Sequence, residues 1–194
     1  AVAAKICDME GGVAAMLTSS GQAANFYAIM NIAEAGDHII CSSAVYGGTY
    51  NLYAHTIRKM GIVATFVDPD ASEEELNAAF KENTKAVVGE TIANPGLNVL
   101  DIEKFAKVAH SHGVPLIVDN TFATPINCRP FEWGADIVTH GVPSQPGNMT
   151  LVAYLGDVPI LGVPGAAIKL PTTVLDVIKL SIPLNKDSTV FSNV

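Results

Sequence analysis

The sequence has few of the residues that stabilise a protein through covalent or metal cross-links. Its three cysteines, Cys7, Cys41 and Cys128, are far apart and odd in number. This pattern argues against a paired disulfide framework and against the closely spaced ligands of a zinc site. We therefore expect no bound metal and a reducing, cytoplasmic location.

Positive charge is also scarce. The chain has 11 lysines and arginines against 19 aspartates and glutamates, which gives a formal net charge of −8. Because no basic stripe is present, electrostatic binding to nucleic acid or to an anionic membrane is not expected. The most apolar window, 151–170, contains Asp157, Pro159, Pro164 and Lys169, so it predicts two short strands and not a membrane span.

Apolar residues are abundant, and the charged residues are distributed unevenly along the chain. They make up 49% of 194 residues, enough to build a sizeable core. Residues 1–140 hold 16 of the 19 acidic and 8 of the 11 basic residues, so the whole net charge lies there. Residues 141–194 hold three of each sign and six of the 11 prolines. This shift predicts two different regions that join near residue 140.

Short apolar runs alternate with helical stretches up to residue 140. The predicted strands are 13–17, 38–42, 62–67, 86–89, 116–118 and 137–138, and the predicted helices are 21–35, 48–60, 75–80 and 101–112. Strands that alternate with helices of this length form a parallel sheet with helices on both faces, so the fold class is α/β. Beyond residue 141, a short proline-rich β/α tail is predicted, with strands 151–154 and 158–162 and a helix 172–180.

Four segments have residues suited to a flat, anionic ligand. Residues 18–24 are small and open a helix, whose N-terminus favours phosphate. Residues 45–50 place two glycines after Tyr46 and leave its ring free for a flat ligand. Residues 89–95 and 117–125 follow strands at their carboxyl ends, where open parallel sheets bind ligands. Taken singly, each segment also fits a structural role, such as a capped helix start or a turn with a packed tyrosine.

Asp119 stands out among these residues because it directly follows the buried apolar run 116–118. A carboxylate in that position needs a partner, and a protonated ring nitrogen would serve. An aspartate that caps the next turn is the structural alternative.

Taken together, the four segments carry a series of ordered motifs. These are EGG at 10–12, SGQAA at 20–24, YGGTYNL at 46–52, FVDPD at 66–70, GETI at 89–92, NP at 94–95, VLDIE at 99–103 and DNTFATP at 119–125. On these motifs, residues 1–140 resemble the large domain of the pyridoxal-phosphate (PLP) enzymes of cysteine and methionine metabolism. That domain has the aspartate-aminotransferase-like (type I) fold, and the O-acetylhomoserine sulfhydrylases are the closest branch.

The resemblance implies that PLP is the cofactor and assigns a role to each matched residue. Gly21 and Gln22 would donate backbone N–H groups to its phosphate. Asp119 would pair with the pyridinium nitrogen and keep it protonated. Asn94 would hydrogen-bond the 3-hydroxyl group of the ring, with Glu90 in support.

Two further side chains are implied to lie against the faces of the ring. Tyr46 would stack on one face and act as the catalytic residue that helps to activate the substrate, and Thr121 would lie against the other. The implied reaction is a γ-replacement on an amino-acid substrate, in which sulfide or a thiol replaces acetate. The implied assembly is a homo-oligomer.

The resemblance breaks after residue 140. The family pattern places His-Ser-x-Thr-Lys after the Ala-Asp-Ile-Val strand, whereas here Gly141, Pro143 and Ser144 stand at the Ser, Thr and Lys positions. The Schiff-base lysine and two phosphate-binding hydroxyls are therefore absent, and we expect the chain to be inactive as written. The only lysines further on are Lys169, Lys179 and Lys186, and none lies in a matching motif.

The later sequence resembles a different family. Residues 140–178 are similar to the C-terminal part of a molybdopterin-binding domain, through 140–149, 154–165 and 172–178, while residues 179–194 match nothing. The predicted domains are thus 1–140, 141–178 and an unassigned tail, 179–194. Two alternatives to the enzyme hypothesis follow, namely a non-catalytic composite binding module with a molybdopterin-type site, or a ligand-free chimera.

Overall fold

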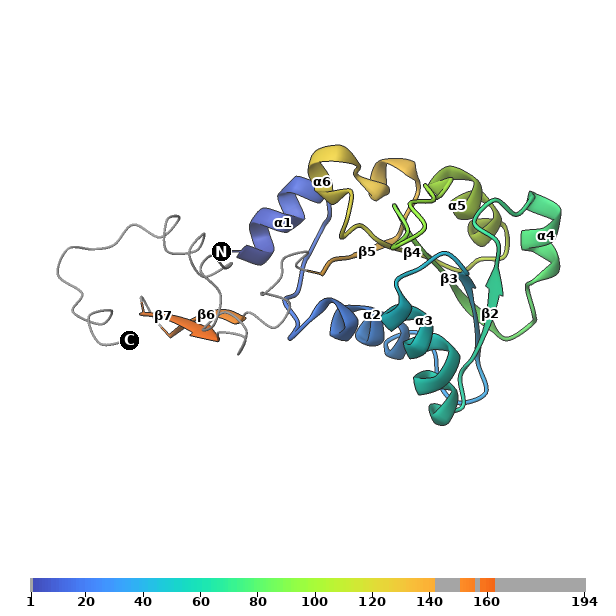
Figure 1. The fold of residues 1–194 in the computed structure, drawn as a ribbon, viewed down its shortest axis with the longest axis horizontal. Helices are drawn as coiled ribbons and strands as arrows, with labels where there is room; N and C mark the ends of the chain where they lie inside the picture. The colour runs from blue at the N-terminus through green and yellow to red at the C-terminus, as the bar shows by residue number, and fades with distance from the viewer. Residues whose placement is uncertain (1, 142–150, 156–157, 163–194) are drawn as a thin grey trace. The chain divides into compact units, whose positions relative to one another are not determined.

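The computed structural model describes residues 2–141, 151–155 and 158–162 (Figure 1). The chain divides into two compact units, Ala1–Gly141 and Val142–Val194. The predicted helix 172–180 lies outside the described residues. So does most of the segment that resembles a molybdopterin-binding domain, and these interpretations stay predictions.

The first unit is built on a five-stranded sheet. Its strands are β1 (His38–Ser42), β2 (Val63–Val67), β3 (Thr84–Glu90), β4 (Leu116–Asp119) and β5 (Ile137–Thr139). They lie in the order β2-β1-β3-β4-β5, and every neighbouring pair is parallel. The α/β prediction is confirmed, and all five carboxyl ends lie at one edge of the sheet.

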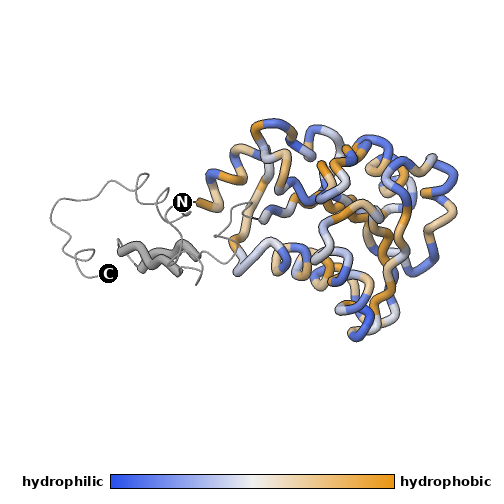
Figure 2. The backbone as a smooth tube through the Cα atoms, viewed as in Figure 1, coloured by the Kyte–Doolittle hydropathy of each residue, from blue (hydrophilic) through white to orange (hydrophobic). Residues whose placement is uncertain are grey.

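The strands of this sheet are largely apolar (Figure 2), and their buried side chains belong to two separate clusters. Helices therefore cover both faces of the sheet. On one face, Ile40 belongs to a buried cluster with residues of α4 (Glu73–Ala78) and α5 (Ile102–Ser111). On the other face, Ile39 belongs to a cluster with Ile29 of α2 (Gly21–Met30) and with the segment that follows α3 (Gly47–Asn51). The alternation along β1 thus places the sheet between two layers of helices.

The start of α4 contains a capping box. The Ser72 hydroxyl accepts a hydrogen bond from the Glu75 N–H at 3.2 Å, and the Glu75 carboxylate accepts one from the Ser72 N–H at 2.8 Å. These two bonds satisfy N–H groups that the first turn of a helix leaves without partners.

Two sequence predictions in the N-terminal part are wrong. Residues 13–17 form no strand, and the apolar Val13 is fully exposed, so the run faces solvent instead of a neighbouring strand. Helix α2 ends at Met30 and not at residue 35, because the chain turns at Asn31 although the apolar pattern continues.

Other elements were not predicted or are less regular than predicted. The helix α1 (Val2–Glu10) and the short helices α6 (Thr124–Asn127) and Pro130–Trp133 have no counterpart in the prediction. The predicted helix 48–60 is α3 followed by a π-helical turn, Leu52–Thr56, and a 3₁₀ turn, Ile57–Met60.

The second unit contains the two strands that were predicted for it. β6 (Leu151–Leu155) and β7 (Val158–Gly162) pair antiparallel, with Leu151 opposite Gly162. Considering only the helices described in either unit, none has the length and apolar character needed to cross a membrane.

His38, at the start of β1, makes the stability of the first unit sensitive to acid. The side chain is 1% exposed, and its ring nitrogens contact the hydroxyls of Thr84 and Thr65, both at 2.8 Å. Burial, with a smaller contribution from Lys81, lowers the pKa of His38 from 6.5 to about 4. The unfolded chain therefore binds a proton between these pH values that the folded chain does not, so stability falls as the pH drops from 6.5 towards 4.

We expect urea unfolding at pH 7 and pH 4.5 to show a smaller loss of unfolding free energy for His38→Gln than for the wild type. Gln retains polar groups but cannot take up the proton. Equal losses in the two proteins would contradict this account of His38.

Candidate functional site

The strand register places polar side chains in a row at the carboxyl edge of the sheet. Glu90 at the end of β3 pairs with Asp119 at the end of β4, and Asp119 pairs with Thr139 at the end of β5. The loop after β1 joins this row, because the Tyr46 N–H donates to Glu90 Oε1 at 2.8 Å. The segments singled out in the sequence therefore meet at one edge.

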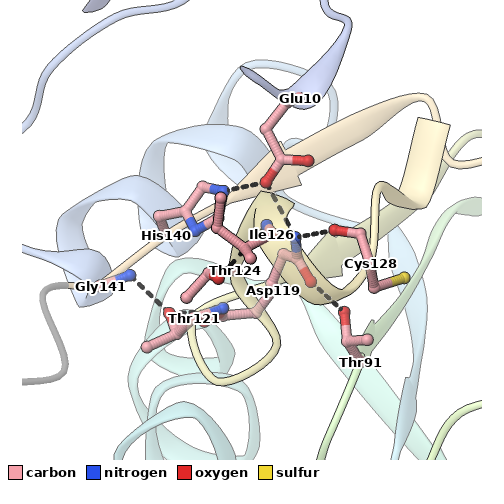
Figure 3. Close-up of polar contacts among 10 residues, drawn as sticks. Glu10, Thr91, Asp119, Thr121, Thr124, Ile126, Cys128, His140 and Gly141 are labelled. Atoms are coloured by element: carbon pink, nitrogen blue, oxygen red, sulfur yellow. Dashed lines mark hydrogen bonds and ion pairs between the residues drawn. The ribbon is translucent and has the colours of Figure 1, made fainter. Parts of the chain in front are cut away.

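Asp119 is held in a fixed orientation by three donors. Its Oδ2 accepts a hydrogen bond from Asn25 Nδ2 at 3.0 Å. Its Oδ1 accepts from the N–H and the hydroxyl of Thr121, at 3.0 and 2.5 Å, and Figure 3 shows these two residues next to each other. Asn25 is buried in α2, and its Oδ1 accepts from the Thr139 hydroxyl at 2.6 Å. In the part of the chain that the structure describes, no lysine, arginine or histidine forms an ion pair with Asp119. Its negative charge can therefore serve a positively charged ligand atom.

Glu90 holds the loop after β1 at the end of β3. Burial raises the pKa of its carboxyl to about 7, and the negative charge of Asp119 adds to this rise, whereas the backbone N–H groups of Tyr46 and Asn94 lower the pKa. Because the carboxyl accepts a hydrogen bond from the Tyr46 N–H, it fixes where Tyr46 stands at the edge.

Because the pKa of Glu90 is raised, its contribution to the free energy of unfolding changes with pH in the direction opposite to that of His38. Between its ordinary pKa of 4.5 and about 7, the folded chain binds a proton that the unfolded chain has lost. The contribution of this group to stability is therefore complete below pH 4.5 and is lost as the pH rises through 7.

We expect Glu90→Gln to lose less unfolding free energy than the wild type between pH 5 and pH 8, as measured by urea titration. Glu82→Gln, at an exposed glutamate, is the control and should follow the wild type. A Glu90→Gln profile that parallels the wild type would show that this carboxyl does not titrate as described.

The start of α2 offers donors for an anion. The Ser20 hydroxyl accepts from the Ala23 N–H at 3.1 Å and caps the helix, whereas the Gly21 and Gln22 N–H groups have no acceptor among the described residues. These N–H groups lie at the positive end of the helix dipole. The Gln22 side chain is engaged elsewhere, since its Nε2 donates to the Thr49 hydroxyl at 2.9 Å.

The segment after β5 runs directly against the start of α2. A Cβ atom on Gly21 would lie 2.6 Å from the Gly141 Cα atom, so only glycine fits at this position. The Gly141 N–H donates to the Thr121 hydroxyl at 2.5 Å, which links this segment to the loop after β4.

The Tyr46 ring remains accessible at the edge. Tyr46 precedes α3 and is 48% exposed, and its ring lies so close to Gly48 that a Cβ atom there would be 2.6 Å from Tyr46 Cε1. Asn94 lies half-buried in the loop after β3. The structure therefore brings all seven predicted site residues to the carboxyl edge, from α2, the loop after β1, and the ends of β3 and β4.

The lysines of the described residues have partners or positions away from the site. Lys85 pairs with Asp37 at 3.8 Å and Lys107 with Glu73 at 2.7 Å, while Lys104 lies over the Phe105 ring. Within residues 2–141, no lysine has a hydrogen bond or ion pair with Tyr46, Glu90, Asp119 or Thr121. Ser144, at the position predicted from the sequence for the family lysine, lies outside the described residues.

Sequence reasoning missed the residues that support the site. Asn25 was detectable, because it lies four positions before the buried Ile29 and so on the inner face of α2. Glu10, Asn120 and His140 gave no comparable signal, because their contacts join segments far apart in the sequence.

Comparisons with known proteins agree with the geometry. Residues 1–143 match the family described as Cys/Met metabolism PLP-dependent enzyme. The chain is 50% identical over 145 residues to the homocysteine/cysteine synthase of Saccharomyces cerevisiae, a match that covers 74% of this chain and 32% of that protein. It is 52% identical over 134 residues to the O-acetyl-L-homoserine sulfhydrylase of Corynebacterium glutamicum, covering 69% and 31%. The chain thus spans about a third of the length of the curated relatives it matches.

Solved structures show the same likeness. A putative O-acetylhomoserine (thiol)-lyase from Campylobacter jejuni, which contains N'-pyridoxyl-lysine-5'-monophosphate, is 38% identical with a TM-score of 0.70 and covers 72% of this chain and 34% of its own. Cystathionine γ-lyase from Lactobacillus plantarum is 40% identical with a TM-score of 0.69, covering 72% and 36%. The sheet and its helices therefore have the type I fold of the large domain, in an incomplete form.

Proposed function

The chain belongs to the Cys/Met metabolism PLP-dependent enzymes, and we propose that its first unit binds PLP at the carboxyl edge of the sheet. The proposed chemistry is the γ-replacement of an O-acetylhomoserine sulfhydrylase, in which sulfide or a thiol replaces acetate on an amino-acid substrate. One observation carries this proposal, namely the Asp119 carboxylate, which is oriented by three donors and is without a cationic partner among the described residues.

The residues present fit the cofactor by their donor and acceptor chemistry. The Gly21 and Gln22 N–H groups would hold the phosphate at the start of α2, and Asp119 would accept a hydrogen bond from the protonated ring nitrogen. PLP, when bound, supplies an electron sink for breaking bonds at the amino acid.

The remaining residues would hold the ring in place. Tyr46 would cover one face and orient the substrate, and Thr121 would limit the other face. Asn94 would donate to the 3-hydroxyl group of the ring, with Glu90 in support.

We propose that the chain as written binds the cofactor without turning over. The family pattern places a lysine where this sequence has Ser144, and no lysine bonds the site among the described residues. A Cβ atom on Gly141 would lie 3.4 Å from the Thr121 hydroxyl, an ordinary contact, so the loss of the family serine at this position is not forced by lack of room.

A homo-oligomer in the cytoplasm is the proposed state. The free thiols of Cys7, Cys41 and Cys128 support a reducing compartment. Val13 and Met16 are exposed at 105% and 75%, and a second copy of the chain would remove this apolar surface from water.

We expect sedimentation velocity to show a larger particle for the wild type than for the double variant Val13→Ser and Met16→Ser. Monomers in both proteins would contradict this assembly.

Equilibrium dialysis with PLP and with pyridoxal tests the proposed function. We expect PLP to bind with a stoichiometry of about one and about tenfold more tightly than pyridoxal, because the phosphate gains charge-assisted bonds at α2. Equal affinities would contradict the placement of the phosphate. Failure of both compounds to saturate the chain would contradict the proposed function itself.

A further inference from the structure

Glu10 is buried where a charged residue is unexpected. It is the last residue of α1 and the only buried residue of that helix, with 3% of its surface exposed. Its Oε2 atom is buried and has no hydrogen-bond partner among the described residues. A carboxylate removed from water with an unmatched oxygen costs free energy, so the contacts made by its other oxygen need an explanation.

Two donors from distant segments converge on that other oxygen (Figure 3). Glu10 Oε1 accepts a hydrogen bond from Asn120 Nδ2 at 2.8 Å, and it also pairs with His140 Nε2. One carboxylate oxygen at the end of α1 thus joins the loop after β4 to the segment after β5.

Asn120 uses every polar atom of its side chain in this arrangement. Its Oδ1 accepts from the Thr91 hydroxyl at 2.8 Å, while its Nδ2 donates to Glu10 Oε1 and to the Cys128 carbonyl oxygen at 2.9 Å. Its backbone N–H donates to the Thr139 carbonyl at 2.9 Å. A side chain bonded in this way cannot rotate without breaking a buried bond.

Each residue that Glu10 contacts is the direct neighbour of residues at the site. Asn120 lies between Asp119 and Thr121, whose side chains bond each other. His140 precedes Gly141, whose N–H donates to the Thr121 hydroxyl. Glu10 itself does not contact Asp119, so its effect on the site passes through the backbone of these two segments.

We propose that Glu10 is a positioning residue, which locks residues 119–121 and 139–141 together through Asn120 and His140. This lock holds the Asp119 carboxylate and the Thr121 hydroxyl in their observed directions. The effect on cofactor binding rests on the proposed function, whereas the ordering of the two segments does not.

A set of variants separates this role from a general contribution to stability. Glu10→Gln keeps a side-chain oxygen that can accept from Asn120 and His140, whereas Glu10→Leu is of similar size and accepts nothing. Asp8→Asn, at an exposed acid on the same helix, is the matched control. If Glu10→Leu does not fold, His140→Ala and His140→Gln form a second pair, since Gln retains a donor towards Glu10.

The first readout is amide hydrogen exchange in the ligand-free, full-length chain. We expect Glu10→Leu to speed exchange at Thr121 and Gly141 about tenfold, as loss of the buried hydrogen bonds to Asn120 and His140 implies, with no change at Ile39 in β1. Glu10→Gln and Asp8→Asn should exchange like the wild type. Unchanged exchange at Thr121 and Gly141, or equal acceleration at Ile39, would overturn the proposal.

The second readout is PLP affinity by equilibrium dialysis. We expect about tenfold weaker binding by Glu10→Leu and rescue to within about threefold by Glu10→Gln. Wild-type affinity in Glu10→Leu would overturn the link from Glu10 to the site. If the wild type binds no PLP, the proposed function fails, and the exchange rates alone decide whether Glu10 orders the two segments.

Discussion

Asp119→Asn is expected to bind PLP about 10- to 100-fold more weakly than the wild type, because a hydrogen bond to a charged partner contributes about 1.5–3 kcal/mol. The asparagine retains one side-chain oxygen for the Thr121 donors, so the loop after β4 should keep its conformation. It loses the negative charge that would hold a protonated ring nitrogen, and its NH2 group replaces the oxygen that accepts from Asn25. Equilibrium dialysis measures the change directly.

A comparison with Asp119→Ala separates charge from structure. Alanine leaves the buried Asn25 amide and the Thr121 donors without their acceptor, which costs about 1–3 kcal/mol per unsatisfied group. We therefore expect urea unfolding to show a clear loss of stability for Asp119→Ala and a smaller one for Asp119→Asn. If Asp119→Asn binds PLP as tightly as the wild type, Asp119 does not hold the cofactor.

The second large effect concerns the covalent link to the cofactor. After incubation with PLP and reduction with borohydride, we expect peptide mapping to find no lysine modified at close to one equivalent per chain. We predict that Ser144 stands at the position of the family lysine, and Lys85 and Lys107 are paired with acidic residues away from the site. A lysine must lie at the ring to be captured efficiently, since exposed lysines react only weakly and without selectivity.

The Campylobacter jejuni relative is the positive control, because its solved structure contains a pyridoxyl-lysine. It should give a single modified lysine at close to one equivalent under the same conditions. A comparable adduct on Lys169, Lys179 or Lys186 of this chain would show that another lysine takes the missing role, and the expectation of inactivity would then be wrong.

The sheet was predictable because its strands are apolar on both sides. Runs such as 116–118 have no polar alternation, which is typical of parallel strands covered by two helical layers. Because Glu90 and Asp119 each follow such a run, their meeting at one edge also follows from the sequence.

The errors arose where tertiary contacts override local pattern. Residues 13–17 are apolar enough for a strand, but no neighbouring strand pairs with them, and Val13 and Met16 lie exposed. A short apolar run does not specify whether a sheet has room for it.

The contacts of Glu10, which support the site, could not be predicted for a related reason. Glu10 bonds residues that are 110 and 130 positions further along the chain. Local sequence contains no information on such pairs, and a glutamate at the end of an otherwise exposed helix is typical of a solvated residue.

The position of the bound cofactor is the most direct test of the account, and an NMR titration of the isotope-labelled chain with PLP measures it. We predict saturable amide shift changes at the start of α2, around Tyr46 and Asn94, and at Thr121, with little change in α4 on the far face of the sheet. Shift changes confined to other parts of the chain, or none at saturating PLP, would contradict a cofactor site at the carboxyl edge.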